Sequence, residues 1–216
     1  NIGMDLENVY FFNGSAYAGK STMVKRLAEK YDGIACEENY HESLMGGLYW
    51  NELPNLGYTA NLKDWADFIR RTPDEYAKWI EDVAKECEIL ELRILEDLVK
   101  TTDKKIFVDT NISLETLGKI TDKDHVLIML ADPSISVSRF FDRPDSEKQF
   151  LYQLLLKEKN PDAAIANFRA CLEKVNSQEN YDKFLHSGFQ ILLKDESRSI
   201  DETMQMVELY LKLKRI

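Results

Sequence analysis

Cysteine is scarce in this sequence of 216 residues. Its three cysteines, Cys36, Cys87 and Cys171, lie far apart and show none of the paired spacings of disulfide frameworks or zinc sites. The sequence therefore excludes a small disulfide-stabilised fold and a cysteine-ligated structural metal. Unpaired cysteines are typical of a reducing compartment, and we expect a cytoplasmic protein.

Positive charge is also in short supply. Lys and Arg number 28 against 38 Asp and Glu, which gives a formal net charge of −10. Because nucleic-acid binding depends on neutralising phosphates with clustered Lys and Arg, we expect no nucleic-acid partner. A single nucleotide can still bind, since its site needs only backbone amides and a few local cations.

Long apolar runs are missing. None approaches the ~20 residues that a membrane-spanning helix needs, so we expect no membrane association. With 44% hydrophobic and 31% charged residues, the composition is that of a globular chain with one good-sized core. We expect a single domain over residues 1–216, and assembly as a homodimer is left open.

Short apolar runs separated by helical stretches define the expected fold. The runs are Val9–Phe12, Gly33–Cys36, Lys105–Asp109, His125–Leu130 and Phe189–Leu193. This alternation predicts an α/β fold with a five-stranded parallel sheet and helices on both faces. Ligands of such sheets bind at the carboxyl ends of the strands. The polar residues expected at those ends are Asn13, Glu37, Glu38, Asp109, Thr110, Asn111 and Asp132.

The turn after the first strand carries the pattern G-x-x-x-x-G-K-[ST], which is typical of a phosphate-binding loop. Its residues are Gly14, Ser15, Ala16, Tyr17, Ala18, Gly19, Lys20, Ser21 and Thr22. The glycines let the backbone approach phosphates, and the following helix offers unpaired N–H groups and the positive end of its dipole. We expect Lys20 to reach the β and γ phosphates and the Ser21 hydroxyl to ligate Mg²⁺.

A helical insertion of about residues 40–102 follows the second strand. Its main helix is expected to begin with a capping box, in which Thr72 caps, Pro73 takes the first position and Glu75 closes the box. Apolar residues then recur with helical spacing at Tyr76, Ile80, Val83, Cys87, Leu90, Ile94 and Leu98. The pattern predicts one buried face, with the acidic residues between on the wet face, and a scaffold role.

An aromatic, turn-rich segment precedes that helix. It contains Tyr49, Trp50, Tyr58 and Trp65. Such rings either wall a substrate pocket or pack the insertion against the sheet, and the sequence leaves both readings open.

The chain after the fourth strand is expected to be helical. Asp132 and Pro133 predict a helix start, and Arg139 and Arg143 share one face of that helix because they are four residues apart. Residues 147–184 continue as helix with a break at Asn160-Pro161. A second capping box, Ser199 with Glu202, begins a last helix that runs through Leu211.

Taken in order, the loop Gly14–Thr22, the strand-end Asp109 and the pair Arg139 and Arg143 resemble the small P-loop kinases. This group of the P-loop nucleoside triphosphate hydrolase superfamily contains shikimate, gluconate, nucleoside and nucleoside-monophosphate kinases and antibiotic phosphotransferases. The run Phe12–Ser21 is similar to the loop of chloramphenicol phosphotransferase-like proteins. The resemblance implies a three-layer α/β/α P-loop kinase fold, with the insertion on the substrate side and a helical lid at about residues 133–160.

The resemblance also implies roles for the site residues. Asp109 would orient Mg²⁺, directly or through water, so that Ser21 and Asp109 form the metal site. Arg139 and Arg143 would close over the transferring phosphoryl group. Glu37 or Glu38, just past the second strand and close to His41, would orient or deprotonate the acceptor hydroxyl. Many such kinases carry a third glycine where this chain has Tyr17, whose role is open.

Structural alternatives stand beside these roles. Asp109 is also placed to cap the turn into Asn111, and the arginines are placed to pair with Asp142, Asp145 or Glu147 on the surface. The residues alone do not decide between the readings.

We therefore expect a kinase that transfers a phosphoryl group from Mg-ATP to a small-molecule acceptor, which is a nucleoside, nucleotide or polar metabolite. GTP as donor is left open. A GTPase-like switch is disfavoured because the N-K-x-D sequence is missing; Thr121–Asp124 approximates it poorly. Val108-Asp109-Thr110 lacks the Glu that activates water in motor ATPases. A non-catalytic nucleotide-binding module stays as an alternative.

Overall fold

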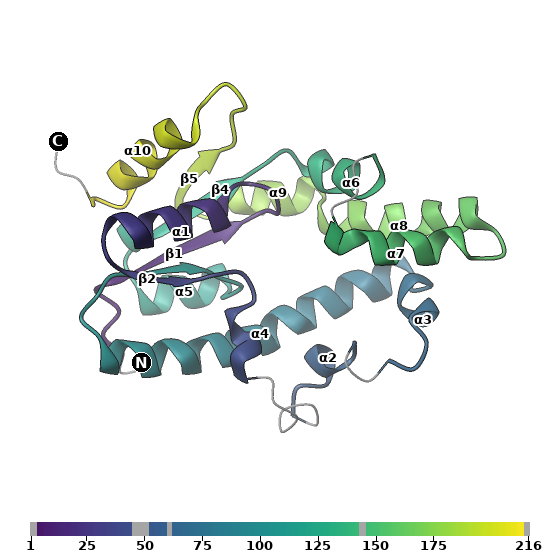
Figure 1. Ribbon diagram of the computed structural model, residues 1–216, viewed down its shortest axis with the longest axis horizontal. Helices are drawn as coiled ribbons and strands as arrows, with labels where there is room; N and C mark the ends of the chain where they lie inside the picture. Colours follow the sequence, from purple (N-terminus) through teal and green to yellow (C-terminus); the bar gives the residue numbers. More distant parts are fainter. Residues whose placement is uncertain (1–3, 45–51, 60–61, 143–145, 214–216) are drawn as a thin grey trace. The chain divides into compact units, whose positions relative to one another are not determined.

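The computed structural model describes residues 4–44, 52–59, 62–142 and 146–213, and Figure 1 shows their arrangement. The strands are β1 Val9–Gly14, β2 Ile34–Cys36, β3 Ile106–Asp109, β4 Val126–Leu130 and β5 Gln190–Leu193. The helices are α1 Lys20–Lys30, α2 Pro54–Gly57, α3 Ala66–Ile69, α4 Pro73–Thr101, α5 Leu114–Ile120, α6 Pro133–Phe141, α7 Ser146–Leu156, α8 Pro161–Val175, α9 Gln178–Leu185 and α10 Ile200–Tyr210, with 3₁₀ turns η1 Tyr40–Leu44 and η2 Lys123–His125.

The five strands form one parallel sheet in the order β2-β3-β1-β4-β5, which confirms the predicted α/β fold. Strands β3 and β4 are buried along their whole length, as near-continuous apolar runs require of strands covered on both faces. In the register of β1 with β3, Phe12 lies opposite Asp109. The carboxyl ends of these two strands therefore lie side by side.

Helices cover both faces of the sheet (Figure 1). Helices α1 and α10 lie on one face, joined by ion pairs from Arg26 to Asp201 and from Lys30 to Glu208. Helix α5 and the later part of α4 lie on the other. Because the chain leaves β1 toward one face and β3 toward the other, the loops after these neighbouring strands diverge. Such a switch point leaves a crevice in which α/β sheets bind ligands.

The predicted helix starts are present. Thr72 and Glu75 form a reciprocal capping box at α4, Asp132 accepts a bond from the Ser134 amide at α6, and Ser199 caps α10 in a second box. The break at Asn160-Pro161 is also observed, with the Asn160 side chain as cap of α8. A further break, at residues 176–177 between α8 and α9, was not predicted.

The burial of α4, a helix of 29 residues, differs from the sequence prediction. Tyr76, Cys87 and Leu90 are buried as expected, but Ile80 is 36% exposed. Two of the acidic residues expected on the wet face, Glu86 and Glu91, are buried. Helical spacing locates the apolar stripe, but it does not identify a carboxylate that finds hydrogen-bond donors inside the protein.

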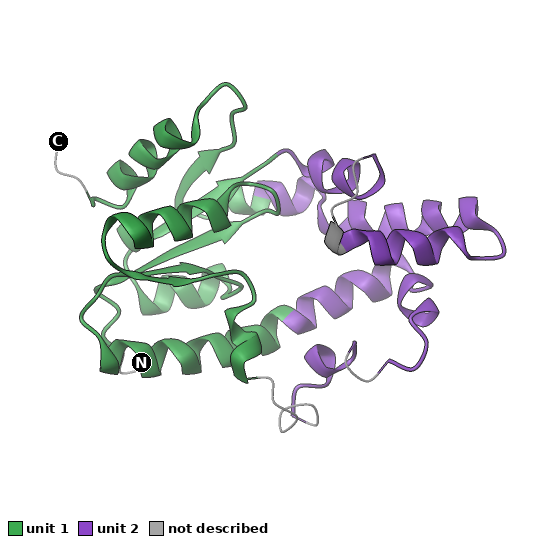
Figure 2. Cartoon of the chain, viewed as in Figure 1, with its two compact units in different colours: residues 1–46, 84–131, 183–216 green, residues 47–83, 132–182 purple. Residues whose placement is uncertain are grey.

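The described chain divides into two compact units, drawn in different colours in Figure 2. Unit 1 comprises residues 1–46, 84–131 and 183–216 and holds the sheet; unit 2 comprises residues 47–83 and 132–182 and is helical. The core of unit 2 is built from Phe68, Ile69, Tyr76, Phe140, Leu155, Phe168 and Cys171. The expected single-domain organisation stays a prediction.

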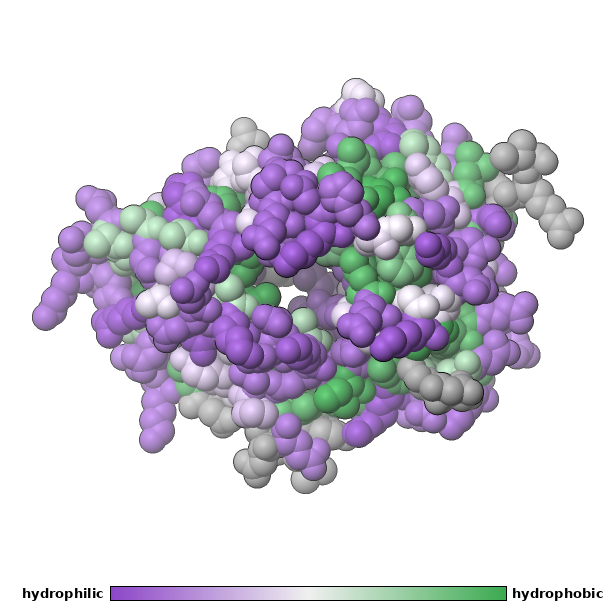
Figure 3. Space-filling view, turned by 180° about the vertical axis from the view of Figure 1, so that it is seen from behind, coloured by the Kyte–Doolittle hydropathy of each residue, from purple (hydrophilic) through white to green (hydrophobic). Residues whose placement is uncertain are grey.

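Hydrophilic residues dominate the face of the molecule drawn in Figure 3, and hydrophobic residues form scattered patches on it. Among the helices of the described residues, each is too short or too polar to cross a membrane.

Candidate functional site

The loop between β1 and α1 has two residues with backbone conformations that favour glycine, and both are glycines. Gly14 has φ +131, and a Cβ placed there would lie 2.0 Å from the carbonyl oxygen of Met129 in β4. Gly19, the N-cap of α1, has φ +95. Both positions are in the region that favours glycine. Tyr17, where the kinases that this loop resembles often have a third glycine, also has a positive φ of 60°.

Contacts with the neighbouring strand β4 and with the segment after β5 hold this loop in place. The Ser15 amide donates to the Met129 carbonyl at 3.1 Å, and the Ser15 hydroxyl accepts from the Ala131 amide at 2.8 Å. Lys194, which follows β5, donates from Nζ to the Tyr17 carbonyl at 2.9 Å. The loop is therefore fixed by β4 and by the segment after β5.

The first turn of α1 is suited to an anion. Its N-cap residue, Gly19, offers no side chain to the free amides, and the turn contains no acidic residue. Unpaired amides and the helix dipole together attract negative charge at such a terminus. The backbone of residues 14–22 is thus compatible with a phosphate-binding loop, which stays a prediction.

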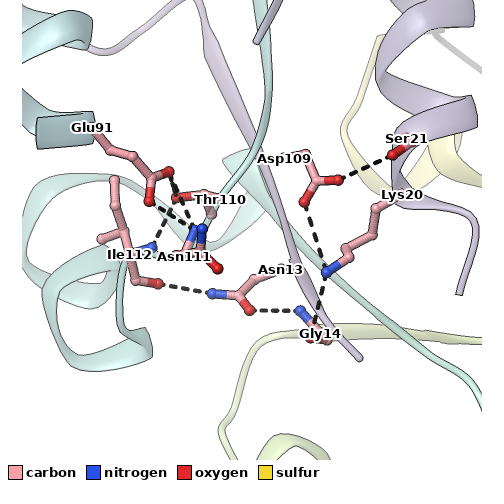
Figure 4. Close-up of polar contacts among 9 residues, drawn as sticks. All are labelled: Asn13, Gly14, Lys20, Ser21, Glu91, Asp109, Thr110, Asn111 and Ile112. Atoms are coloured by element: carbon pink, nitrogen blue, oxygen red, sulfur yellow. Dashed lines mark hydrogen bonds and ion pairs between the residues drawn. The ribbon is translucent and has the colours of Figure 1, made fainter. Parts of the chain in front are cut away.

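Two side chains of that first turn converge on Asp109 at the end of β3 (Figure 4). The Lys20 Nζ lies 3.7 Å from Asp109 Oδ1, and the Ser21 hydroxyl donates to Asp109 Oδ2 at 3.5 Å. Lys20 also donates to the Gly14 carbonyl at 3.5 Å. The topology of the sheet thereby joins residues 88 positions apart in the sequence. The predicted association of Lys20, Ser21 and Asp109 is thus present.

Asp109 is 6% exposed, and its environment acts on its charge in opposite directions. Burial raises the pKa of the Asp109 carboxyl above its ordinary value, and the charge of Lys20 acts to lower it. The carboxylate of Glu38 raises it further. A cation placed beside Asp109 would favour its ionised form, so the site is suited to bind one.

The two strand-end glutamates after β2 differ in their surroundings. Glu37 is exposed and pairs with Lys25 of α1 at 3.1 Å. Glu38 is also exposed, but it acts electrostatically on Asp109. The nearby His41 is buried, with its Nε2 3.6 Å from the Cys87 Sγ, and burial lowers its pKa. Of these residues, Glu38 is the one whose charge acts on Asp109.

The remaining sequence-predicted residues belong to unit 2 or lie outside the described residues. Arg139 is an exposed residue of α6 in unit 2. Arg143, Tyr49 and Trp50 lie outside the described residues. Tyr58 and Trp65 make ring contacts within unit 2, with Trp79 and Phe68 respectively, so packing is the observed role of these two rings.

Sequence reasoning missed Glu91. This residue of α4 is fully buried, and its Oε1 accepts from the Thr110 hydroxyl at 2.9 Å. The Asn111 amide donates to both of its oxygens, at 3.2 and 3.1 Å. Burial raises the pKa of Glu91 to about 7, although these hydrogen bonds lower it. Glu91 thus binds the two residues that follow Asp109.

A pocket of about 240 Å³ adjoins the loop within unit 1. Its walls come from three places: the loop and α1, the end of β4, and the stretch from the end of β5 to the start of α10. They include Ala18, Thr22, Met129, Leu193 and Arg198. The mixture of apolar and polar walls, close to the amides of α1, is suited to a planar ring with polar edges.

A second acidic group lies at the other end of the sheet. Asp122, Asp124 and His125 come together just before β4, at the amino ends of the strands. Asp124 contacts Lys212 and His125, and the other ring nitrogen of His125 contacts the Glu7 carbonyl. These contacts indicate a structural role for this group of residues.

The sequence was compared with models of protein families and with curated proteins, and neither comparison finds a match. The assignment of the site therefore depends on its own residues and geometry.

Proposed function

We propose that this protein transfers the γ-phosphoryl group of a nucleoside triphosphate to the hydroxyl or phosphate of a small molecule. The observation that carries the proposal is that Lys20 and Ser21, in the first turn of α1, both contact the buried carboxylate of Asp109. Backbone amides, one ammonium and one carboxylate at a strand end are the parts that a phosphoryl-transfer site requires. The neighbouring pocket supports the proposal, because it offers space for a nucleotide base beside the loop.

The residues present fit a magnesium ion. Mg²⁺ prefers oxygen ligands, and the Ser21 hydroxyl and Asp109 carboxylate supply two that already face one another. Burial raises the pKa of Asp109, which a divalent cation would offset. Ser21 and Asp109 would hold the ion, and the chemistry it supplies is neutralisation of charge on the phosphate oxygens.

The chain's own groups account for the rest of the reaction. The acceptor oxygen forms a bond to the γ phosphorus as the bond to the β,γ-bridging oxygen breaks, and the nucleoside diphosphate leaves with that electron pair. Lys20 stabilises the charge on the transferring group. For a hydroxyl acceptor, Glu38 takes its proton, since its charge acts on Asp109 while Glu37 pairs with Lys25.

Arg139 and Arg143 keep their proposed role as cations of a lid that stabilises the transferring phosphoryl group. Only the resemblance and their shared spacing support this role. Replacing Arg139 by Ala and by Lys tests it: a phosphoryl-stabilising cation predicts a loss of turnover in both variants, larger in Ala.

Calorimetry and turnover together test the proposed function. Purified protein is titrated with Mg-ATP and with Mg-GTP, and the two affinities identify the donor. Metabolite pools are then screened by mass spectrometry for a nucleotide-dependent gain of one phosphate. We expect saturable binding of a triphosphate and at least one phosphorylated product; the absence of heat with both nucleotides contradicts the proposal.

A pair of lysine variants on α1 separates a kinase from a nucleotide-binding module. Lys20→Met removes the ammonium that faces Asp109, and we expect roughly 10²–10³-fold slower transfer. Lys25→Met is the matched control, because Lys25 is exposed on the same helix and pairs only with Glu37 in the described contacts of its ammonium. A module without catalysis shows an altered affinity in Lys20→Met and no turnover in any form of the protein.

A further inference from the structure

A chain of hydrogen bonds connects α4 with the phosphate-binding loop inside unit 1 (Figure 4). It begins at Glu91, which accepts from the Thr110 hydroxyl. The Thr110 oxygen in turn accepts from the Ile112 amide at 3.0 Å, and the Ile112 carbonyl accepts from the Asn13 side-chain amide at 2.8 Å. The Asn13 Oδ1 then accepts from the amide of Gly14 at 2.6 Å. We call these residues the Glu91 relay.

Every member of the relay before Gly14 is buried. Glu91 and Ile112 are 0% exposed, Thr110 is 3% exposed and Asn13 is 9% exposed. Hydrogen bonds away from water hold their partners more firmly than exposed ones, and a missing partner leaves a buried polar group unsatisfied. The relay is therefore a stiff connection between the loop after β3 and the loop after β1.

The last residue of the relay is the one whose position is most restricted. Gly14 has no room for a Cβ, and its carbonyl accepts from the Lys20 ammonium. The Gly14 amide already donates to the Asn13 Oδ1. This hydrogen bond orients the backbone of the loop, and the amide is not one that contacts phosphate. A small rotation at Asn13 would shift the amides that follow Gly14.

We propose that Glu91 is a positioning residue, which sets the phosphate-binding loop through the Glu91 relay and thereby determines the loop's affinity for a nucleotide polyphosphate. This inference rests on the function proposed above. Glu91 touches neither Lys20 nor Asp109 in the described hydrogen bonds and ion pairs; it acts through Thr110 and Asn111. A carboxylate suits this position because Oε1 accepts from both the Thr110 hydroxyl and the Asn111 amide, and Oε2 also accepts from the Asn111 amide.

The Glu91→Gln variant tests the relay with the least change in shape. A glutamine keeps one carbonyl oxygen for Thr110 and Asn111, but its NH₂ group takes the place of Oε2, which accepts from the Asn111 amide in the parent protein. Two donors then face one another, and the negative charge of the carboxylate is lost. Measured at pH 8, where Glu91 is ionised, the dissociation constant for Mg-ATP is expected to rise about tenfold, because a lost charge-assisted hydrogen bond has this magnitude. Calorimetry measures the constant on the folded variant.

Glu88→Gln is the matched control. Glu88 is a glutamate of the same helix, and its Oε1 accepts from the Ser113 amide of the same loop at 2.8 Å. It makes no described hydrogen bond to Thr110, Ile112 or Asn13, and a glutamine at this position keeps a carbonyl oxygen that accepts from the Ser113 amide. We expect its affinity for Mg-ATP to stay within twofold of the parent protein.

A second readout needs no nucleotide. The Gly14 amide proton, observed by NMR on labelled protein, reports the last bond of the relay through its chemical shift and its exchange with solvent. We expect a shifted and faster-exchanging Gly14 amide in Glu91→Gln and an unchanged one in Glu88→Gln. This measurement separates the two ideas: if the parent protein binds no nucleotide, the proposed function fails while the relay is still tested.

Thr110 supplies a variant pair in case Glu91→Gln does not fold. Thr110→Val removes the hydroxyl at nearly constant shape, and Thr110→Ser restores it. We expect the Gly14 amide and the Mg-ATP affinity to change in the Val variant and to return toward the parent values in the Ser variant. Gly14 signals that match the parent in both Glu91→Gln and Thr110→Val, or affinities within twofold of it, overturn the proposal.

Discussion

The two units bury different kinds of side chain. The buried polar and charged residues of the described chain all belong to unit 1: Asn13, His41, Glu86, Glu91, Asp109, Thr110 and Glu208. Unit 2 closes its core with aromatic rings, including Phe68, Tyr76, Phe140 and Phe168. Buried polar groups are unfavourable unless they are paired, and they fix their partners when they are. We therefore predict that substitution of a buried polar residue in unit 1 can change activity without lowering the free energy of unfolding. Substitutions in the core of unit 2 should chiefly lower the free energy of unfolding.

The largest expected effect is on turnover in unit 1. Asp109→Asn removes the charge that faces Lys20 and Ser21, and we expect phosphoryl transfer to fall by roughly 10³-fold. The free energy of unfolding should stay equal or rise, because burial raises the pKa of Asp109 and an amide is easier to bury than a carboxylate. Steady-state kinetics and urea denaturation of the same preparation measure both; a large loss of stability would break the comparison.

The next effect is on stability in unit 2. Phe168 is 2% exposed and contacts the rings of Phe68, Tyr76 and Phe140. Phe168→Ala should lower the free energy of unfolding by about 3–5 kcal/mol, because a cavity replaces the ring. Phe150→Ala, at a ring that is 53% exposed in the same unit, serves as the control and should change stability by less than ~1 kcal/mol. Equal losses in the two variants would contradict the assigned core.

A pH effect of intermediate size follows from Glu91. Burial raises the pKa of Glu91 from 4.5 to about 7, so between these values the folded state keeps a proton that the unfolded state has released. Stability is therefore highest below pH 4.5 as far as this group is concerned, and it falls by up to ~3 kcal/mol as the pH rises to 7. The ionisable groups that act on Glu91 are Tyr40 of η1, Cys36 of β2, Asp109 of β3 and Cys87 of α4.

Denaturation curves at pH 5, 6, 7 and 8 measure this effect. The difference between the parent protein and Glu91→Gln isolates the titration of one carboxyl, since the glutamine does not ionise. We expect the parent to lose stability relative to the variant as the pH rises, and a difference that is flat with pH would exclude the titration.

The smallest effects compare the two capping boxes, one in each unit. Thr72→Ala removes the cap of α4 in unit 2, and Ser199→Ala removes the cap of α10 in unit 1. Each should lower the free energy of unfolding by about 1 kcal/mol, because one amide loses its acceptor. Thermal melts of the two variants sharpen the comparison: similar values show that the units differ in what they bury and not in how their helices begin.

Most of the fold could be predicted because its signals are local. The apolar runs gave the five strands, Thr72 and Ser199 marked helix starts, and the glycines at 14 and 19 marked the loop. The proximity of Lys20 and Asp109 needed one further step, the rule that carboxyl ends of parallel strands share an edge. These inferences depend on residues close together in sequence or on general topology.

The rest depended on partners that are distant in sequence. Glu91 has the spacing of a solvated residue, and only donors 19 and 20 positions away explain its burial. The exposure of Ile80, inside an apolar stripe, likewise depends on what packs against each part of α4. Glu37 and Glu38 are neighbours of the same type, and the difference between them appeared only with Lys25 and Asp109 in place.

The left-handed backbone at Tyr17 has a consequence for the whole loop. A side chain with a Cβ holds this conformation against a strain of order 1 kcal/mol, which a glycine would not feel. The Lys194 ammonium, 177 positions further along the chain, donates to the carbonyl of this strained residue. A lysine that is distant in sequence thus contributes to holding the loop in its left-handed conformation at Tyr17.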